Sequence, residues 1–176
     1  MPSLPATRRN ALLAIPAVDR TRRNHGLEHA TITILSQRLR GRNLVGRSTP
    51  FGFHLYGAVT TAALESAVQE ALRRMQGGEV SLAVHPNCGT NFVTAGIAAG
   101  VAAYIGFLGA NSASARRDRL PLVTLLATAA LMFAQPLGLE LQRRVTTSGE
   151  MRGLQITSIG RRQNGRLTSH FVATEG

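Results

Sequence analysis

Residues 92–110 read FVTAGIAAGVAAYIGFLGA, and this run of nineteen apolar or small side chains decides the class of fold. Residues 120–139 form a second run of twenty mostly apolar residues, and no side chain from residue 80 to residue 115 is charged. About twenty residues of helix cross the hydrocarbon core of a bilayer. We therefore expect a two-helix transmembrane hairpin over residues 92–139, rather than two core helices of a soluble protein.

The turn between the two runs is short and contains Arg116, Arg117 and Arg119. In the first run, Gly96 and Gly100 stand four residues apart and so share one face of a helix. Small side chains let two membrane helices approach closely. The spacing therefore predicts that the two helices of the hairpin pack together on this face.

The charge of the chain is carried by arginine. All twenty basic residues are arginine and none is lysine, and nine acidic residues leave a net charge of +11. The guanidinium group pairs with phosphate, which is found both in anionic lipids and in nucleic acids. The arginines are scattered, and the chain has two Tyr and no Trp on which bases could stack. We therefore expect membrane lipids as partners, and nucleic acid is an unlikely one.

The orientation in the membrane does not follow from counting positive charges, because arginines lie in the turn and on both flanks of the hairpin. The region before the hairpin opens with a short apolar run that Pro16 interrupts, and it contains no good export signal. We expect a protein of the cell membrane with two spans and both termini in the cytoplasm.

The sequence before the hairpin contains a motif typical of metal sites. Residues 24–30 read NHGLEHA, which spaces His25, Glu28 and His29 as H-x-x-E-H within a helical pattern. Residues three and four apart share a helix face, so two imidazoles would supply half of a tetrahedral zinc shell. We predict His25 and His29 as metal ligands and Glu28 as a catalytic base. The alternative is a pair of hydrogen-bonded core histidines that pack the helix against its neighbours.

A second group of reactive side chains precedes the first span, where residues 85–91 read HPNCGTN. A cysteine at the start of a helix tends toward the thiolate, because the helix dipole stabilises negative charge. His85 and Cys88 are therefore candidate metal ligands, or a base and its nucleophile. A tight turn that uses Asn87 and Gly89 would explain the same residues without any chemistry. Cys88 is the single cysteine of the chain, which excludes an intramolecular disulfide.

The remaining pattern predicts an α+β membrane protein. Strands over residues 43–47 and 51–58, a helix capped by Thr60 or Thr61, and a strand over residues 79–84 complete an N-terminal αββαβ unit. Asn-Gly is a strong hairpin signal, and here it marks a C-terminal β-hairpin that we expect to join the N-terminal sheet. The expected parts are residues 1–23 as a disordered or amphipathic lead-in, 24–91 as the α/β portion with the site, 92–139 as the transmembrane hairpin and 140–176 as the C-terminal β-hairpin.

Two resemblances add to this interpretation. The spacing H-x-x-E-H is similar to the motif of the inverzincin peptidases, which implies His25 and His29 as zinc ligands and Glu28 as the base. Those peptidases take a third ligand from a downstream glutamate, whereas no acidic residue lies between Glu79 and Asp118 here. The phrases RNHGLEHATI and LAVHPNCGTN resemble a family of small uncharacterised prokaryotic membrane proteins, a domain of unknown function. That resemblance implies two spans and an N-terminal α/β portion, and it implies no activity.

These observations lead to three hypotheses of function. The first is a membrane-anchored, zinc-dependent hydrolase that acts near the membrane surface, most simply a peptidase, with His85 or Cys88 completing the site. The second is a non-catalytic membrane accessory protein that binds a metal or a protein partner through the same side chains. The third is a thiol enzyme that uses Cys88.

Overall fold

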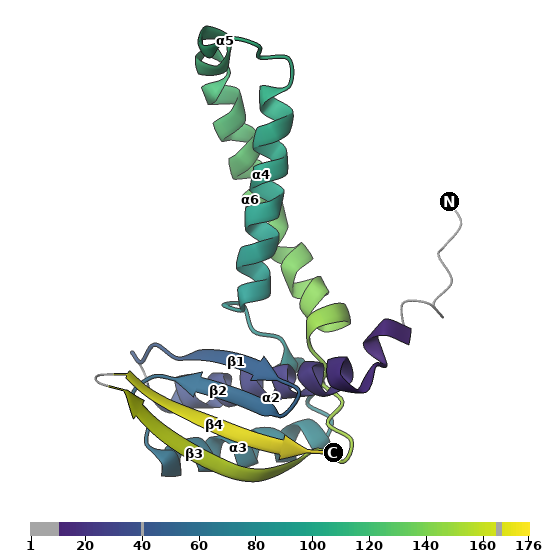
Figure 1. Cartoon of the computed structure of the whole chain (residues 1–176), viewed down its shortest axis with the longest axis vertical. Helices are drawn as coiled ribbons and strands as arrows, with labels where there is room; N and C mark the ends of the chain where they lie inside the picture. The colour runs from purple at the N-terminus through teal and green to yellow at the C-terminus, as the bar shows by residue number, and fades with distance from the viewer. Residues whose placement is uncertain (1–10, 40, 165–166) are drawn as a thin grey trace. The chain divides into compact units, whose positions relative to one another are not determined.

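The computed structural model describes residues 11–39, 41–164 and 167–176 of the chain (Figure 1). The chain forms two compact units. Unit 1 contains Met1–His85 and Arg143–Gly176, and unit 2 contains Pro86–Gln142. The long segment that returns after unit 2 thus belongs to the same unit as the N-terminal part.

Unit 1 is built on a four-stranded antiparallel sheet with the strand order β1-β2-β4-β3. The strands are β1 (Val45–Thr49), β2 (Gly52–Tyr56), β3 (Gln155–Asn164) and β4 (Leu167–Glu175). Strand β4 lies between β2 and β3, with Leu55 opposite His170 in the register. The prediction that the C-terminal hairpin joins the N-terminal sheet is therefore confirmed. The glycine of the Asn-Gly turn lies outside the described residues.

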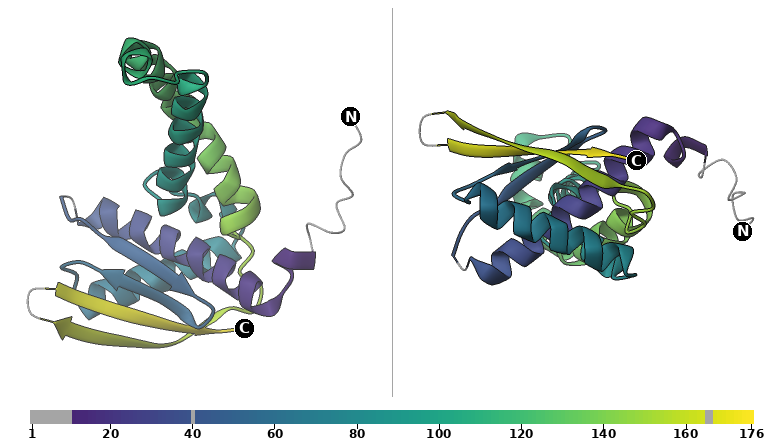
Figure 2. Two further views of the ribbon diagram at one scale, coloured as in Figure 1. Left: turned by 45° about the horizontal axis from the view of Figure 1, so that its top comes forward. Right: turned by 90° about the horizontal axis from the view of Figure 1, so that it is seen from below.

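Two helices, α2 (Pro16–Arg38) and α3 (Thr61–Gln76), cover one face of this sheet (Figure 2). Thr60 caps α3 as predicted, because its side chain accepts a hydrogen bond from the backbone N–H of Ala63. The core between the layers contains fully buried side chains from both helices and the sheet: Leu27, Leu35, Phe53, Leu55, Leu64, Val68 and Val172. Each such side chain contributes about 1.5–3 kcal/mol relative to an exposed position.

The start of α2 differs from the expected one. The lead-in was expected to extend to residue 23, but α2 begins at Pro16, and residues 1–10 lie outside the described part. Proline is favoured in the first turn of a helix, and Asp19 there pairs with Arg23 one turn later, with 3.1 Å between Oδ2 and Nε. The helix therefore starts two turns before the histidine motif.

The predicted strand over residues 79–84 is wrong. This segment forms the 3₁₀ helix η1 (Val80–Ala83), so the order of elements in the N-terminal part is α2-β1-β2-α3-η1. The segment packs against α2, and its backbone at Val80 touches Gly149, where an added Cβ would lie 2.8 Å from the Val80 oxygen. A close helical turn fits between these neighbours, and no strand of the sheet pairs with it.

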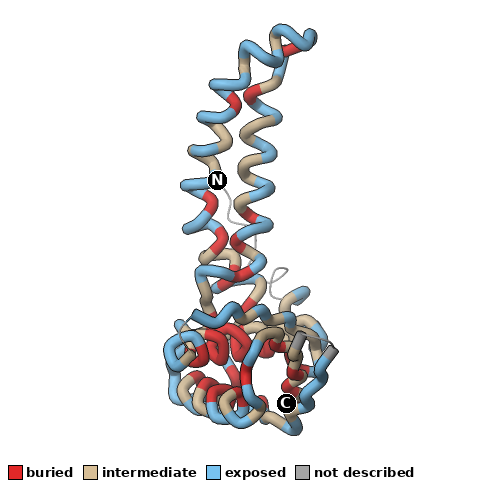
Figure 3. The backbone as a smooth tube through the Cα atoms, turned by 90° about the vertical axis from the view of Figure 1, so that its left-hand side faces the viewer, coloured by how far each residue is buried: buried red, intermediate tan, exposed pale blue. Residues whose placement is uncertain are grey.

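Unit 2 is a helical hairpin made of α4 (Gly89–Phe107), the short α5 (Ala113–Asp118) and α6 (Leu120–Leu141). A π-helical segment, η2 (Gln142–Thr146), continues α6 into unit 1. Helix α4 and the segment from Leu120 to Thr146 are long and apolar enough to cross a membrane. Most of their surface is exposed in the hairpin (Figure 3), including Phe92 at 70% and Phe133 at 76%.

The close contacts of the hairpin involve other glycines than those predicted. Gly96 and Gly100 have open space around the position of an added Cβ. Gly106 instead lies against Val123, where an added Cβ would come within 2.8 Å of a side-chain carbon. Gly138 lies against Asn91, where an added Cβ would come within 2.5 Å of Oδ1.

Candidate metal centre

Helix α2 carries the histidine motif, and Asn24 fixes its rotation relative to the sheet. This fully buried side chain donates from Nδ2 to the Thr49 carbonyl at 2.9 Å and accepts from the Thr174 hydroxyl at 2.7 Å. The bonds join α2 to β1 and β4, both of which lie far from Asn24 in the sequence. They satisfy a buried amide that would otherwise be costly, and they permit one orientation of the helix.

The two histidines of the motif lie side by side on this helix. Their ring centroids are 4.4 Å apart. His25 Nδ1 is 2.9 Å from the Thr146 carbonyl oxygen, and His29 Nδ1 is 2.7 Å from the Ala83 carbonyl oxygen. A carbonyl can only accept, so both Nδ1 atoms carry the proton and both lone pairs are on Nε2. A backbone carbonyl on one ring nitrogen is the usual support of a histidine that binds a metal through the other.

The third residue of the motif, Glu28, is buried beside strand β1. Its carboxylate accepts a hydrogen bond from the Ser48 hydroxyl. Gly46 gives it room, because a Cβ at that position would lie 2.0 Å from Oε1. Burial raises the pKa of Glu28 above its ordinary value, while the Ser48 hydrogen bond and the charge of His25 act in the opposite direction. A carboxylate with a raised pKa is a stronger base than an ordinary glutamate.

His85 is the last residue of unit 1 before the hairpin, and it lies next to the histidine pair. Its ring centroid is 5.8 Å from that of His29. Burial and then the charge of His29 lower the pKa of His85, so the neutral imidazole is favoured. The structure thus brings three of the predicted site histidines together within one unit.

Cys88 follows His85 by three residues and belongs to unit 2. It is the N-cap of α4, and its sulfur accepts a hydrogen bond from the backbone N–H of Thr90 at 3.4 Å. The side chain of Cys88 is buried. The imidazoles of His25 and His29 belong to unit 1 and are two side chains of the kind that bind a metal ion.

Next to Cys88, a polar cluster holds the base of the hairpin together. Asn91 donates from Nδ2 to the Pro86 carbonyl at 2.6 Å and accepts from Gln142 Nε2 at 2.7 Å. Both side chains are buried. The cluster fixes the loop that carries Cys88 against the end of α6.

The other two histidines lie away from this group. His54 on β2 packs against Phe171 of β4, with ring centroids 4.6 Å apart. His170 is buried on β4, and its Nε2 is 3.2 Å from the Thr61 hydroxyl. Burial, followed by the charge of Arg161, lowers the pKa of His170. His54 thus pairs across two strands, whereas His170 joins the sheet to the start of α3.

Sequence reasoning missed three residues that shape the site, namely Asn24, Gly26 and Ser48. An added Cβ on Gly26 would lie 2.2 Å from the Ser148 carbonyl oxygen and 3.1 Å from the Ala83 side chain. Asn24 and Gly26 flank His25 in the sequence, and this position could have identified them as residues that shape the site. Ser48 stands in a cluster of turn residues, and nothing in its sequence context indicates a role in the site.

The fold and the site define a class of protein, namely a mixed α/β unit with a candidate metal site and two helices suited to cross a membrane. Residues 20–159 match the family described as Domain of unknown function (DUF6391), and the chain belongs to this family. It is also 40% identical over 95 residues to an uncharacterised protein of Picosynechococcus sp. (strain ATCC 27264 / PCC 7002 / PR-6). The match covers 46% of each chain, so it spans about half the length of that relative. No solved structure matches the chain.

Proposed function

We propose that the protein is a membrane-anchored, zinc-dependent hydrolase, with peptides as the substrate class. The observation that carries the proposal is the pair of carbonyl hydrogen bonds that place the lone pairs of His25 and His29 on Nε2. Core histidines could use either ring nitrogen for packing. Two neighbouring imidazoles with the same supported tautomer are what a zinc site requires.

His85 or Cys88 is proposed as the third ligand, and His85 lies beside His29 in the same unit. Thiolate and imidazole are the preferred zinc ligands, and three protein ligands leave a position for water, as in catalytic sites. A zinc ion held there would lower the pKa of a water molecule toward neutrality. Glu28 would take up the proton, and Ser48 would hold its carboxylate in place.

The membrane anchor is supported by the surface of the hairpin. In each of the two long helices, 17% of the most apolar stretch is buried. A core helix of a soluble protein, by contrast, is mostly buried. Exposed apolar side chains cover both helices, and a bilayer is the solvent in which such a surface is stable. We propose a cell-membrane protein with two spans and with both termini in the cytoplasm.

One observation favours a second function, a non-catalytic metal-binding accessory protein. The Glu28 carboxylate is already engaged by Ser48 and lies against Gly46 of β1. In this case Glu28 would join α2 to the sheet and would not react. The two functions share the metal site and differ in the role of one carboxylate.

Metal analysis of the purified full-length protein tests the site. We expect about one equivalent of zinc in the wild type, and its loss in His25→Ala and His29→Ala, since two remaining ligands bind weakly. His54→Ala is the matched control and should keep the metal. Cobalt substitution tests Cys88, because a thiolate ligand gives a charge-transfer absorption that Cys88→Ser would remove. Equal zinc content in all histidine variants would refute the metal site.

Glu28→Gln separates the two functions. We expect the zinc content to be retained and peptide hydrolysis in detergent micelles to fall by about 10²-fold or more, as for loss of a general base. Glu65→Gln changes an exposed carboxylate on α3 and should leave the rate unchanged. Equal hydrolysis by Glu28→Gln and the wild type would favour the accessory function.

A further inference from the structure

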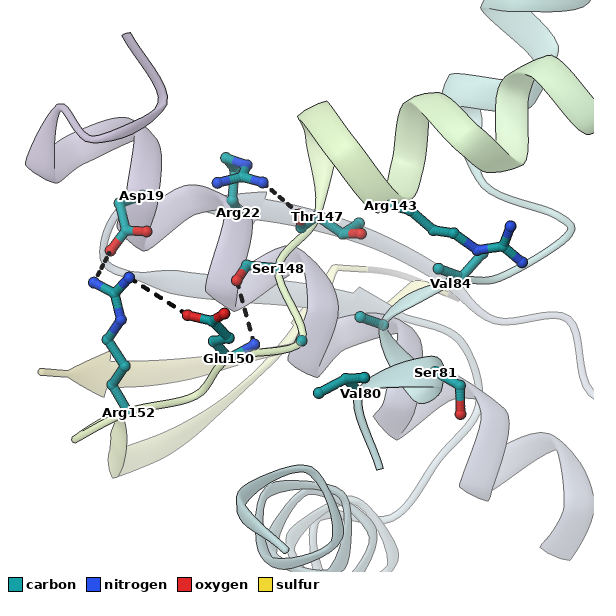
Figure 4. A pocket seen from close by; sticks show the side chains of 12 residues that line it. Asp19, Arg22, Val80, Ser81, Val84, Arg143, Thr147, Ser148, Glu150 and Arg152 are labelled. Carbon is teal, nitrogen blue, oxygen red and sulfur yellow. Dashed lines mark hydrogen bonds and ion pairs between the residues drawn. The ribbon is translucent and has the colours of Figure 1, made fainter. Parts of the chain in front are cut away.

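A cavity in unit 1 lies beside the histidine pair and is not used by the proposed reaction. It has a volume of about 530 Å³ (Figure 4). Its lining includes Arg22 of α2, Ala83 at the end of η1 with Val84 after it, and the loop of residues 147–150. Ala83 also accepts the hydrogen bond of His29, so the cavity and the histidines share one stretch of backbone.

Arg22 gives the cavity its electrostatic character. Its Nε donates to the Val145 carbonyl at 2.7 Å, and its Nη2 donates to the Thr147 carbonyl at 3.0 Å and to that of Arg144 at 3.3 Å. These bonds hold the guanidinium still without neutralising it. None of the ion pairs between described residues involves Arg22. A fixed, uncompensated guanidinium at a cavity wall favours an anionic ligand.

The two carboxylates of the lining do not cancel this charge, because arginines already pair with both. Asp19 Oδ2 is 3.1 Å from Arg23 Nε and 3.6 Å from Arg152 Nη1. Glu150 Oε2 is 3.5 Å from Arg152 Nη2. Figure 4 shows Arg152 between these two acids, at one end of the cavity. Arg143 also lines the cavity.

Chain connectivity places this cavity near the ends of both long helices. Arg143 follows Leu141, the last residue of α6, by two residues, and Val84 precedes Gly89, the first residue of α4, by five. Two extended residues reach about 7 Å at most. If the helices cross a bilayer, Arg143 stays within the depth of the lipid headgroups. Phosphate is the anion that is concentrated in that layer.

We propose that this cavity binds the phosphate of an anionic lipid headgroup, with Arg22 and Arg143 as its cationic contacts. Ser148 lines the same space and carries a hydroxyl group, which is able to donate to a phosphate oxygen. The inference rests on the membrane part of the proposed function and not on the zinc chemistry. Its role is to bind a lipid next to the site and so to hold unit 1 at the bilayer surface.

Lipid binding to the full-length protein in neutral detergent micelles tests this proposal. Phosphatidylglycerol should bind saturably, as followed by native mass spectrometry, and diacylglycerol with the same acyl chains should not. Arg143→Ala should weaken the binding about tenfold, because a charge-assisted hydrogen bond is lost. Arg144→Ala removes the same charge from the next residue, which does not line the cavity, and should keep the affinity within about twofold.

Three results would overturn the proposal. Equal weakening by Arg143→Ala and Arg144→Ala would show general attraction between a basic surface and acidic lipid. Binding of soluble glycerophosphoglycerol or inorganic phosphate as tight as that of the lipid would assign the cavity to a free phosphate group. Displacement of the lipid by a short peptide with a free carboxylate would assign the cavity to a peptide substrate. Zinc content in Arg143→Ala is measured in parallel, so failure of the metal site is recognised separately.

Discussion

At the scale of single residues, Gly26 affects both the geometry of the site and the stability of unit 1. It stands between the two histidines at the point where α2 meets the Ser148 carbonyl, which an added Cβ would approach to 2.2 Å. We expect Gly26→Ala to lower stability by about 1–3 kcal/mol, as overpacking of a rigid contact does. The measurement is the thermal unfolding midpoint in detergent.

Gly160→Ala is the control for this prediction. Gly160 lies on β3, has no positive φ, and has nothing within 4 Å of an added Cβ. Its substitution should be neutral or slightly stabilising, since alanine is less flexible in the unfolded chain. Should Gly26→Ala unfold at the wild-type temperature, the tight approach of α2 to the Ser148 carbonyl would be wrong.

The residues of the motif could be selected from the sequence because their pattern is local. Helical geometry alone predicts that His25, Glu28 and His29 share a face. Their partners could not be predicted, because His25 bonds a carbonyl 121 positions away and His29 one 54 positions away. Such contacts depend on where distant segments of the chain pack against α2. The spacing of residues within one helix carries no information about this packing.

At the scale of elements, strand β4 carries a buried histidine whose protonation opposes folding. The pKa of His170 is lowered from its ordinary value of 6.5 by burial and by Arg161 on the adjacent strand. The unfolded chain therefore takes up a proton first as the pH falls. The contribution of neutral His170 to the stability of the fold is fully present above pH 6.5. This contribution is lost as the pH decreases from 6.5 through the lower pKa of the folded state.

We therefore predict that His170→Leu flattens the dependence of the unfolding midpoint on pH between about 7.5 and 5. The wild type should lose more stability on acidification than the variant, whatever the effect of the substitution at pH 7.5. His54→Leu, on the neighbouring strand β2, serves as the comparison. Parallel curves for His170→Leu and the wild type would show that His170 titrates alike in both states.

Elements with a strong local pattern were predicted well, and those defined by their neighbours were not. The capping residue predicted where α3 begins, because Thr60 is its N-cap. The alternation of residues 79–84 is equally regular, yet the segment forms η1, because its neighbours are α2 and Gly149 instead of a strand edge. Alternation shows which side chains are apolar and does not provide a pairing partner.

At the scale of the whole molecule, the sheet constrains how the chain can cross a membrane. Strand β2 precedes the hairpin and β4 follows it, and the two are paired in one sheet. If the hairpin crosses a membrane, both of its flanks must lie on the same side, so the number of crossings is even. This agrees with two spans and does not depend on how arginines are distributed.

Cysteine labelling with a membrane-impermeant maleimide tests this topology in cells. On a Cys88→Ser background, Gln69→Cys on α3 and Arg162→Cys on β3 probe the two flanks, and Asn111→Cys probes the turn between α4 and α5. All three positions are exposed. If both flanks are cytoplasmic, Asn111→Cys reacts in intact cells, whereas the other two react only after lysis. Equal reaction at all three positions would mean that the helices do not span, and different behaviour of Gln69→Cys and Arg162→Cys would contradict the shared sheet.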